Sequence, residues 1–118
     1  MDMLDELRAL GVNVDEAVGR FMGNSDLYKR MLLKFVNMIK EMESPIQELF
    51  AAKKYDELIE KTHTIKGTTG NLSITPLYKA YTDIVDFLRT GREDEAEEIY
   101  NKIMPVQKDI VACLEKYL

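Results

Sequence analysis

The sequence predicts an all-α protein, an antiparallel up-down-up-down four-helix bundle with two short N-terminal helices covering one end. In four long segments, apolar residues recur at alternating spacings of four and three, which is typical of the buried face of packed helices. The connections between these segments are short, and no stretch shows the alternation of a half-buried strand. We therefore expect one domain over residues 1–118, with short helices in 1–23 and the bundle in 25–118.

The first 23 residues predict two short helices. Asp2 can cap the first helix and Gly11 ends it, while Asp15 can cap the second, which ends near Gly23. One side of the first helix carries Leu4, Leu7 and Leu10.

The first long helix is expected to start within Asn24-Ser25-Asp26, which offers a capping side chain. Its seam, meaning the apolar stripe that faces other helices, consists of Tyr28, Leu32, Phe35, Ile39, Met42, Ile46 and Leu49. Pro45 lies inside this pattern, where a proline kinks a helix without necessarily ending it. The alternative is two helices broken at Ser44-Pro45.

A turn at Ala52-Lys53-Lys54 precedes the second long helix, which opens at Tyr55-Asp56 and extends to Asn71 or Leu72. Its seam consists of Leu58, Thr62, Ile65, Thr69 and Leu72. Thr75-Pro76, an N-cap followed by proline, starts the third long helix, and Gly91 ends it.

The fourth long helix opens with Glu93-Asp94-Glu95, which favours the helix dipole. Its predicted seam consists of Ile99, Ile103, Val106, Ile110, Cys113 and Tyr117. Pro105 predicts a kink, and Cys113 is expected to be a small core residue and not a reactive thiol. The methionines expected to fill the core or its border are Met31, Met38, Met42 and Met104.

The only histidine, His63, lies on the second long helix. At about 100° per residue it is nearly opposite the seam, with Lys66 at i+3, Gly67 at i+4 and Gly70 at i+7. Each interior glycine costs about 1 kcal/mol relative to alanine. One interpretation is an ordinary exposed histidine with glycines nearby by chance. The other is that the glycines let a bulky group approach His63, and that Lys66 neutralises negative charge on the ring nitrogen.

This stretch resembles the histidine-containing phosphotransfer (HPt) domains of two-component phosphorelays, whose motif is His-x-x-Lys-Gly followed by small residues and an apolar one. The matching residues are His63, Lys66 and Gly67, then the small Thr68, Thr69 and Gly70, then Leu72. The resemblance covers nearly the whole chain, and its other parts are Leu10-Gly11-Val12, Asp15, Phe21-Met22-Gly23, Leu27-Tyr28 and Phe35. The sequence departs from the pattern at Ser73, where many members carry glycine.

The resemblance implies that His63 accepts a phosphoryl group from the phospho-aspartate of a response-regulator receiver domain and passes it to another receiver aspartate. A sensor or hybrid histidine kinase would supply the phosphate. Lys66 would stabilise phosphoryl charge, and Gly67 and Gly70 would let the receiver approach. Magnesium is expected in the partner receiver, and this chain would need no cofactor or metal of its own.

We expect partner-docking residues around His63. Ile59, at i−4, is the one sizeable apolar residue on this side of the helix, and partial burial against a neighbouring helix is an equal alternative. Glu60, Thr64 and Asn71 would form the polar rim of the same patch.

The residues also indicate what the chain does not do alone. Asp56 and Glu60 are the only carboxylates on the His63 face, and Gly67-x-x-Gly70 lies within a helix where no phosphate-binding loop can form. We therefore expect that the chain is not an enzyme but a phosphorelay intermediate without an ATP or metal site of its own. It would be either a free-standing protein or part of a larger histidine kinase.

Composition limits the partners and the compartment. A net charge of −5 disfavours nucleic acid and anionic membranes, which are bound through basic patches. One cysteine permits no internal disulfide, and neither a membrane-spanning apolar run nor a signal peptide is visible. We expect a cytoplasmic monomer. Two alternative functions remain, a phosphorylatable N-terminal module of a chemotaxis-type histidine kinase and a helical adaptor that uses no phosphate.

Overall fold

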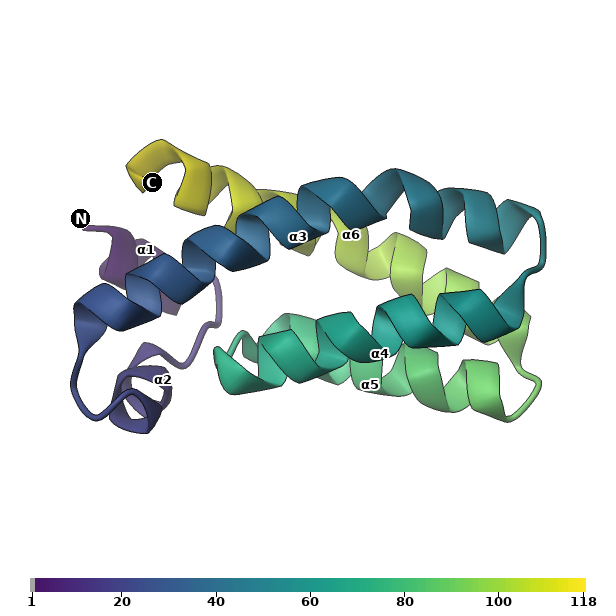
Figure 1. Ribbon diagram of the computed structural model, residues 1–118, viewed down its shortest axis with the longest axis horizontal. Coiled ribbons are helices and arrows are strands. Elements are labelled where there is room, and N and C mark those ends of the chain that lie inside the picture. Colours follow the sequence, from purple (N-terminus) through teal and green to yellow (C-terminus); the bar gives the residue numbers. More distant parts are fainter. Residues whose placement is uncertain (1) are drawn as a thin grey trace.

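The protein, described here by a computed structural model for residues 2–118, consists of six α-helices, and this part of the chain contains no β-strand (Figure 1). The helices are α1 (Met3–Ala9), α2 (Val14–Arg20), α3 (Ser25–Ala51), α4 (Tyr55–Asn71), α5 (Thr75–Arg89) and α6 (Glu93–Tyr117). The prediction of an all-α chain is confirmed. The alternative of a break at Ser44-Pro45 is wrong, because α3 continues through Pro45 just as α6 continues through Pro105.

The four long helices surround one apolar core. Helix α4 packs against α3 and α5, and α6 packs against α5 and α3. They extend along the long dimension of the molecule, which measures 40 × 24 × 20 Å (Figure 1). The short helices lie at one end of the long ones, where α1 contacts α6 and α2 contacts α3. No helix within residues 2–118 has the length and apolar character needed to span a membrane.

The seams predicted for α3 and α4 are confirmed. All five predicted α4 seam residues are buried, as are all of those on α3 except Met42, which is half-buried. Two of the α4 residues are threonines, and each hydroxyl donates to the carbonyl one turn back, from Thr62 Oγ1 to Leu58 O and from Thr69 Oγ1 to Ile65 O, both at 2.8 Å. This bond satisfies a hydroxyl that would otherwise be costly to bury.

The seam predicted for α6 is partly wrong. Tyr117 is exposed, and Ile99, Ile103 and Val106 are only half-buried. The buried face is turned by about one residue and consists of Ala96, Tyr100, Gln107, Ile110, Cys113 and Leu114. Gln107 can be buried because its Oε1 accepts a hydrogen bond from the Tyr81 hydroxyl at 2.6 Å. Cys113 is a core residue, as predicted, and burial raises the pKa of its thiol.

Two of the four predicted helix caps are confirmed. Asp2 accepts a hydrogen bond from the Asp5 amide, and Asn24 accepts one from the Leu27 amide. Asp15 does not cap α2, because Asn13 occupies that position and accepts from the Glu16 amide at 3.2 Å. Thr75 does not cap α5 either, since it is already helical and the N-cap is Ile74.

The three-residue connections between the long helices are tight because each contains one residue in the left-handed region of backbone conformation, where the chain reverses direction. Directly beyond α3, α4 and α5, the residues with positive φ are Lys53, Ser73 and Gly91. After α4, the Ile74 amide donates back to Thr69 O at 2.9 Å, which is the Schellman bond that closes a helix C-terminus.

Candidate functional site

Helix α4 carries the predicted site and is held mainly by its buried face. Asp56 and Glu57 lie in its first turn, where carboxylates favour the helix dipole. Its interior glycines lower helix propensity, so packing of the seam must supply the stability that the exposed face does not.

His63 is exposed on α4, as the sequence predicted. Its imidazole forms no hydrogen bond or ion pair with any other residue in the described part of the chain. Lys66, one turn further along, is half-buried, and its ammonium group likewise pairs with no described residue. Gly67 is exposed, and a Cβ added there would have no atom of another residue within 4 Å. A nucleophilic ring, a free cation and bare backbone therefore lie together on one turn of helix.

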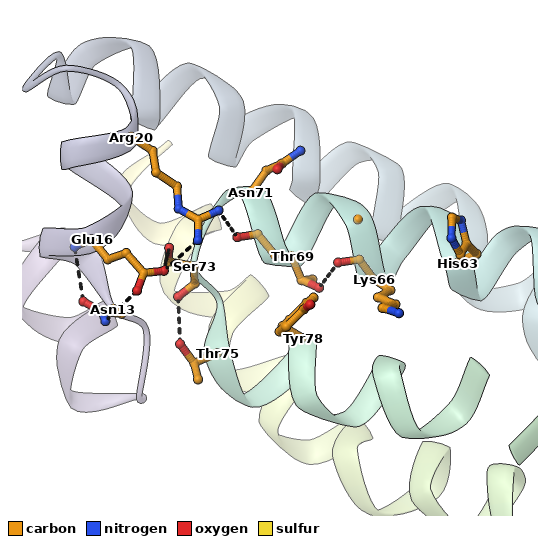
Figure 2. Close-up of a pocket in the computed structure, with 12 residues that line it drawn as sticks. Asn13, Glu16, Arg20, His63, Lys66, Thr69, Asn71, Ser73, Thr75 and Tyr78 are labelled. Atoms are coloured by element: carbon orange, nitrogen blue, oxygen red, sulfur yellow. Dashed lines mark hydrogen bonds and ion pairs between the residues drawn. The ribbon is translucent and has the colours of Figure 1, made fainter. Parts of the chain in front are cut away.

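These residues line an open hollow of about 470 Å³ between α4, α2 and α5 (Figure 2). His63 lies at one end, Arg20 of α2 lies at the other, and Lys66 and Tyr78 lie between them. Two cations, Lys66 and Arg20, and one carboxylate, Glu16, face this space. The hollow is therefore more positive than the chain as a whole, whose net charge is −5.

Gly70 lies in different surroundings from Gly67. A Cβ at Gly70 would come within 2.9 Å of Tyr78 Cε1 and 3.0 Å of Tyr78 Cδ1, so the Tyr78 ring of α5 rests directly on the α4 backbone. The space over Gly70 is thus filled by the protein's own side chain, whereas the sequence suggested that it is kept clear for a partner.

Helix α2 holds the C-terminal end of α4 through a polar network (Figure 2). Ser73 Oγ donates to Glu16 Oε1 at 2.7 Å, and Arg20 Nη2 donates to the same oxygen at 3.0 Å. Arg20 Nη1 donates to Gly70 O at 3.0 Å, where it satisfies a carbonyl of the last turn of α4. The Asn13 amide donates to Ser73 O at 2.9 Å.

Ser73 adopts a backbone conformation that favours glycine, and the network explains how a serine occupies this position. Its φ is 54°, in the left-handed region that favours glycine. Its hydroxyl and its carbonyl are both anchored to α2, and these bonds offset part of the strain of a non-glycine residue there.

The predicted docking residues are not all brought together. Asn71, the last residue of α4, lines the hollow beside Gly70. Glu60 and Thr64 are exposed, but they line a separate depression with Met42, Glu57 and Lys61. Ile59 is half-buried against the core and does not line the hollow, which agrees with the alternative of partial burial.

Sequence reasoning missed the contributions of Arg20, Glu16 and Tyr78. Arg20 and Gly70 are 50 positions apart, so no local pattern connects them. The only usable indication was Gly70 itself, because a glycine inside a helix can mark close approach of another group as well as open space.

Within residues 2–118 no three histidine, cysteine, aspartate or glutamate side chains gather as they do in a metal site. The residues present offer a ring nitrogen able to attack an electrophile and a cation able to stabilise negative charge beside it.

Comparisons with protein-family models, with curated proteins and with solved structures each found no match. Function therefore has to be argued from the site itself.

Proposed function

We propose that this protein is a histidine phosphotransfer protein or domain of a two-component phosphorelay, with His63 as the residue that is phosphorylated. The observation that carries the proposal is the combination on one exposed turn of His63, Lys66 and Gly67. The first two have side chains without partners among the described residues, and the third leaves open space beside them. A helix selected for stability alone would not need a glycine there, since alanine is better by about 1 kcal/mol.

The proposed reaction is transfer from a receiver aspartyl phosphate to the imidazole. The unprotonated nitrogen of the neutral ring attacks phosphorus, and a nitrogen–phosphorus bond forms as the bond from phosphorus to the aspartate oxygen breaks. The aspartate leaves as a carboxylate with the electron pair, and the proton on the other ring nitrogen equilibrates with water. Lys66 stabilises the charge on the phosphoryl oxygens during the transfer. The reverse reaction passes the group to a second receiver.

The partner supplies what the chain is not expected to provide. Receiver domains of this kind carry the reacting aspartate and its magnesium, and a sensor or hybrid histidine kinase feeds the relay. Helices α3 to α6 form, in this proposal, an antiparallel up-down-up-down four-helix bundle with α1 and α2 over one end. Such a bundle gives a rigid support that presents the ring at a fixed height above the surface.

The experiment that tests the function is phosphorylation of the wild-type protein and of His63→Gln. Wild type should acquire acid-labile phosphate from a phosphorylated receiver and from phosphoramidate, a small donor that needs no partner. His63→Gln should acquire none, while its circular dichroism and melting temperature stay unchanged because the ring is exposed.

Acid-labile phosphate on His63→Gln would overturn the assignment. Labelling only by ATP and a separate kinase domain would favour the chemotaxis-type module instead. A wild type that takes no phosphate from any of these donors would favour the adaptor.

A further inference from the structure

Resting on the proposed function, we propose that Tyr78 is a docking residue for the phosphorylated receiver, and that position 70 is glycine because it seats the Tyr78 ring. The structure thus assigns the two glycines of α4 different roles. Gly67 leaves room for the group that reaches His63, and Gly70 fixes an aromatic contact beside that path.

The geometry of the ring favours a binding role. Tyr78 is 42% exposed although one edge of its ring lies on the α4 backbone at Gly70. Its backbone carbonyl accepts from Thr82 Oγ1, but its phenol hydroxyl has no partner among the described residues. In Figure 2 the side chain rises from α5 to lie beneath the turn between Lys66 and Thr69. The ring therefore offers a partner both an apolar face and an unused polar group.

A ring that is already seated binds at little entropic cost. Tyrosine has only two side-chain torsions, and contact with Gly70 restricts them before the partner arrives. Arg20 faces the same hollow and is held by Glu16 and by Gly70 O. Tyrosine and arginine are among the residue types that dominate binding energy at protein interfaces.

The charge of the hollow selects the occupant. Lys66 and Arg20 outnumber Glu16, so the hollow attracts an acidic surface although the chain itself is negative. The phosphorylated receiver of the proposed function is such a partner, because the phosphoryl group on its aspartate is anionic. A receiver surface that enters the hollow to reach His63 lies against Tyr78, which borders the same hollow.

The test compares Tyr78→Ala with Leu33→Ala, a matched control on α3 that is also 42% exposed and does not line the hollow. Transfer from a phosphorylated receiver is measured as a function of receiver concentration. Tyr78→Ala should raise the half-saturating concentration about ten-fold. The maximal rate should stay within about two-fold of wild type, because the side chain is not expected to touch the phosphoryl group. Leu33→Ala should match wild type.

Two further variants keep the proposal falsifiable if Tyr78→Ala lowers stability. Tyr78→Phe keeps the ring and should retain most of the affinity, and Gly70→Ala, which displaces the ring without removing it, should weaken binding by about three-fold or more. Phosphorylation of His63 by phosphoramidate should be unchanged in every variant. Unchanged half-saturation in Tyr78→Ala, or equal weakening in Leu33→Ala, would overturn the docking role. A wild-type protein that takes phosphate from neither donor would overturn the proposed function instead.

Discussion

Alanine substitution at the two glycines of α4 should have different consequences for the free energy of unfolding. At Gly67 a Cβ meets no other residue within 4 Å, so Gly67→Ala should gain the full helix propensity of alanine, about 1 kcal/mol. For a domain of 118 residues this gain raises the melting temperature by about 4 °C. At Gly70 the same Cβ would lie 2.9 Å from a carbon of the Tyr78 ring, well inside the usual carbon–carbon contact of about 3.5–4.0 Å.

The ring must therefore move in Gly70→Ala. Pushing an aromatic side chain off its preferred rotamer costs about 0.5–1.5 kcal/mol, which is as much as the propensity gain. We expect Gly70→Ala to be neutral or slightly destabilising. In a Tyr78→Ala background the obstruction is gone, and Gly70→Ala should then stabilise by about 1 kcal/mol.

Urea unfolding of the single and double variants, followed by far-UV circular dichroism, gives the coupling free energy between positions 70 and 78. We expect about 1 kcal/mol, and the same cycle between Gly67 and Tyr78 should give a value near zero. If the coupling at Gly70 is below about 0.3 kcal/mol, or if Gly70→Ala stabilises wild type as much as Gly67→Ala does, then the ring does not depend on the glycine.

The remaining predictions address the transfer reaction, the end of α4 and the effect of pH. Gly67→Gln should fold normally but slow phosphoryl transfer from a receiver, because the glutamine side chain stands in the open space beside His63. Transfer at the wild-type rate would refute this role for the glycine. Lys66→Ala should lower the maximal transfer rate and leave affinity for the unphosphorylated receiver intact, with only partial recovery in Lys66→Arg; loss of affinity at an unchanged maximal rate would make the lysine a docking residue. Ser73→Ala keeps the positive φ and loses the hydroxyl hydrogen bond to Glu16 of α2, so it should lower the free energy of unfolding by about 1 kcal/mol. Ser73→Gly also loses that bond but removes the backbone strain, so its stability should be closer to that of wild type. Equal losses of unfolding free energy for the two variants in urea would show that the backbone at position 73 is not strained. The pKa of the Glu6 carboxyl group is lowered by several causes, the first of which is the hydrogen bond from Lys116. Ionised Glu6 therefore stabilises the folded protein at pH values above the ordinary carboxyl pKa, and this stabilisation is lost as the pH falls through the lowered pKa of the folded state. Glu6→Gln should therefore melt at a lower temperature than wild type at neutral pH, and the difference should disappear in acid; a difference that is constant with pH would rule out the ionised pair as its source.

Local patterns were sufficient to predict α4 and its exposed histidine. Its seam is the only apolar stripe on that segment, and the residue opposite a buried stripe has to face water. The periodicity therefore determined which way His63 points before any neighbouring helix was known.

The same reasoning failed on α6 because that segment offers two overlapping stripes. The stripe of Ile99, Ile103 and Val106 is more apolar, yet the buried face contains Tyr100 and Gln107. The hydrogen bond from the Tyr81 hydroxyl of α5 makes burial of a glutamine acceptable, and this partner is 26 positions away. A choice that depends on a distant side chain cannot be read from the spacing within one helix.

The candidate site shows the same division between local and distant causes. His63 and Gly67 are four residues apart on one helix, so the turn that joins them is about 6 Å long at 1.5 Å per residue. Beyond it the surface is closed by Tyr78 over Gly70 and by Arg20 at the last turn. In the proposed function, a partner brings the phosphoryl group over this open turn, and side chains from α2 and α5 border the hollow that its body would enter. In this proposal the α4 motif provides the chemistry, and selection among partners depends on residues that the motif does not contain.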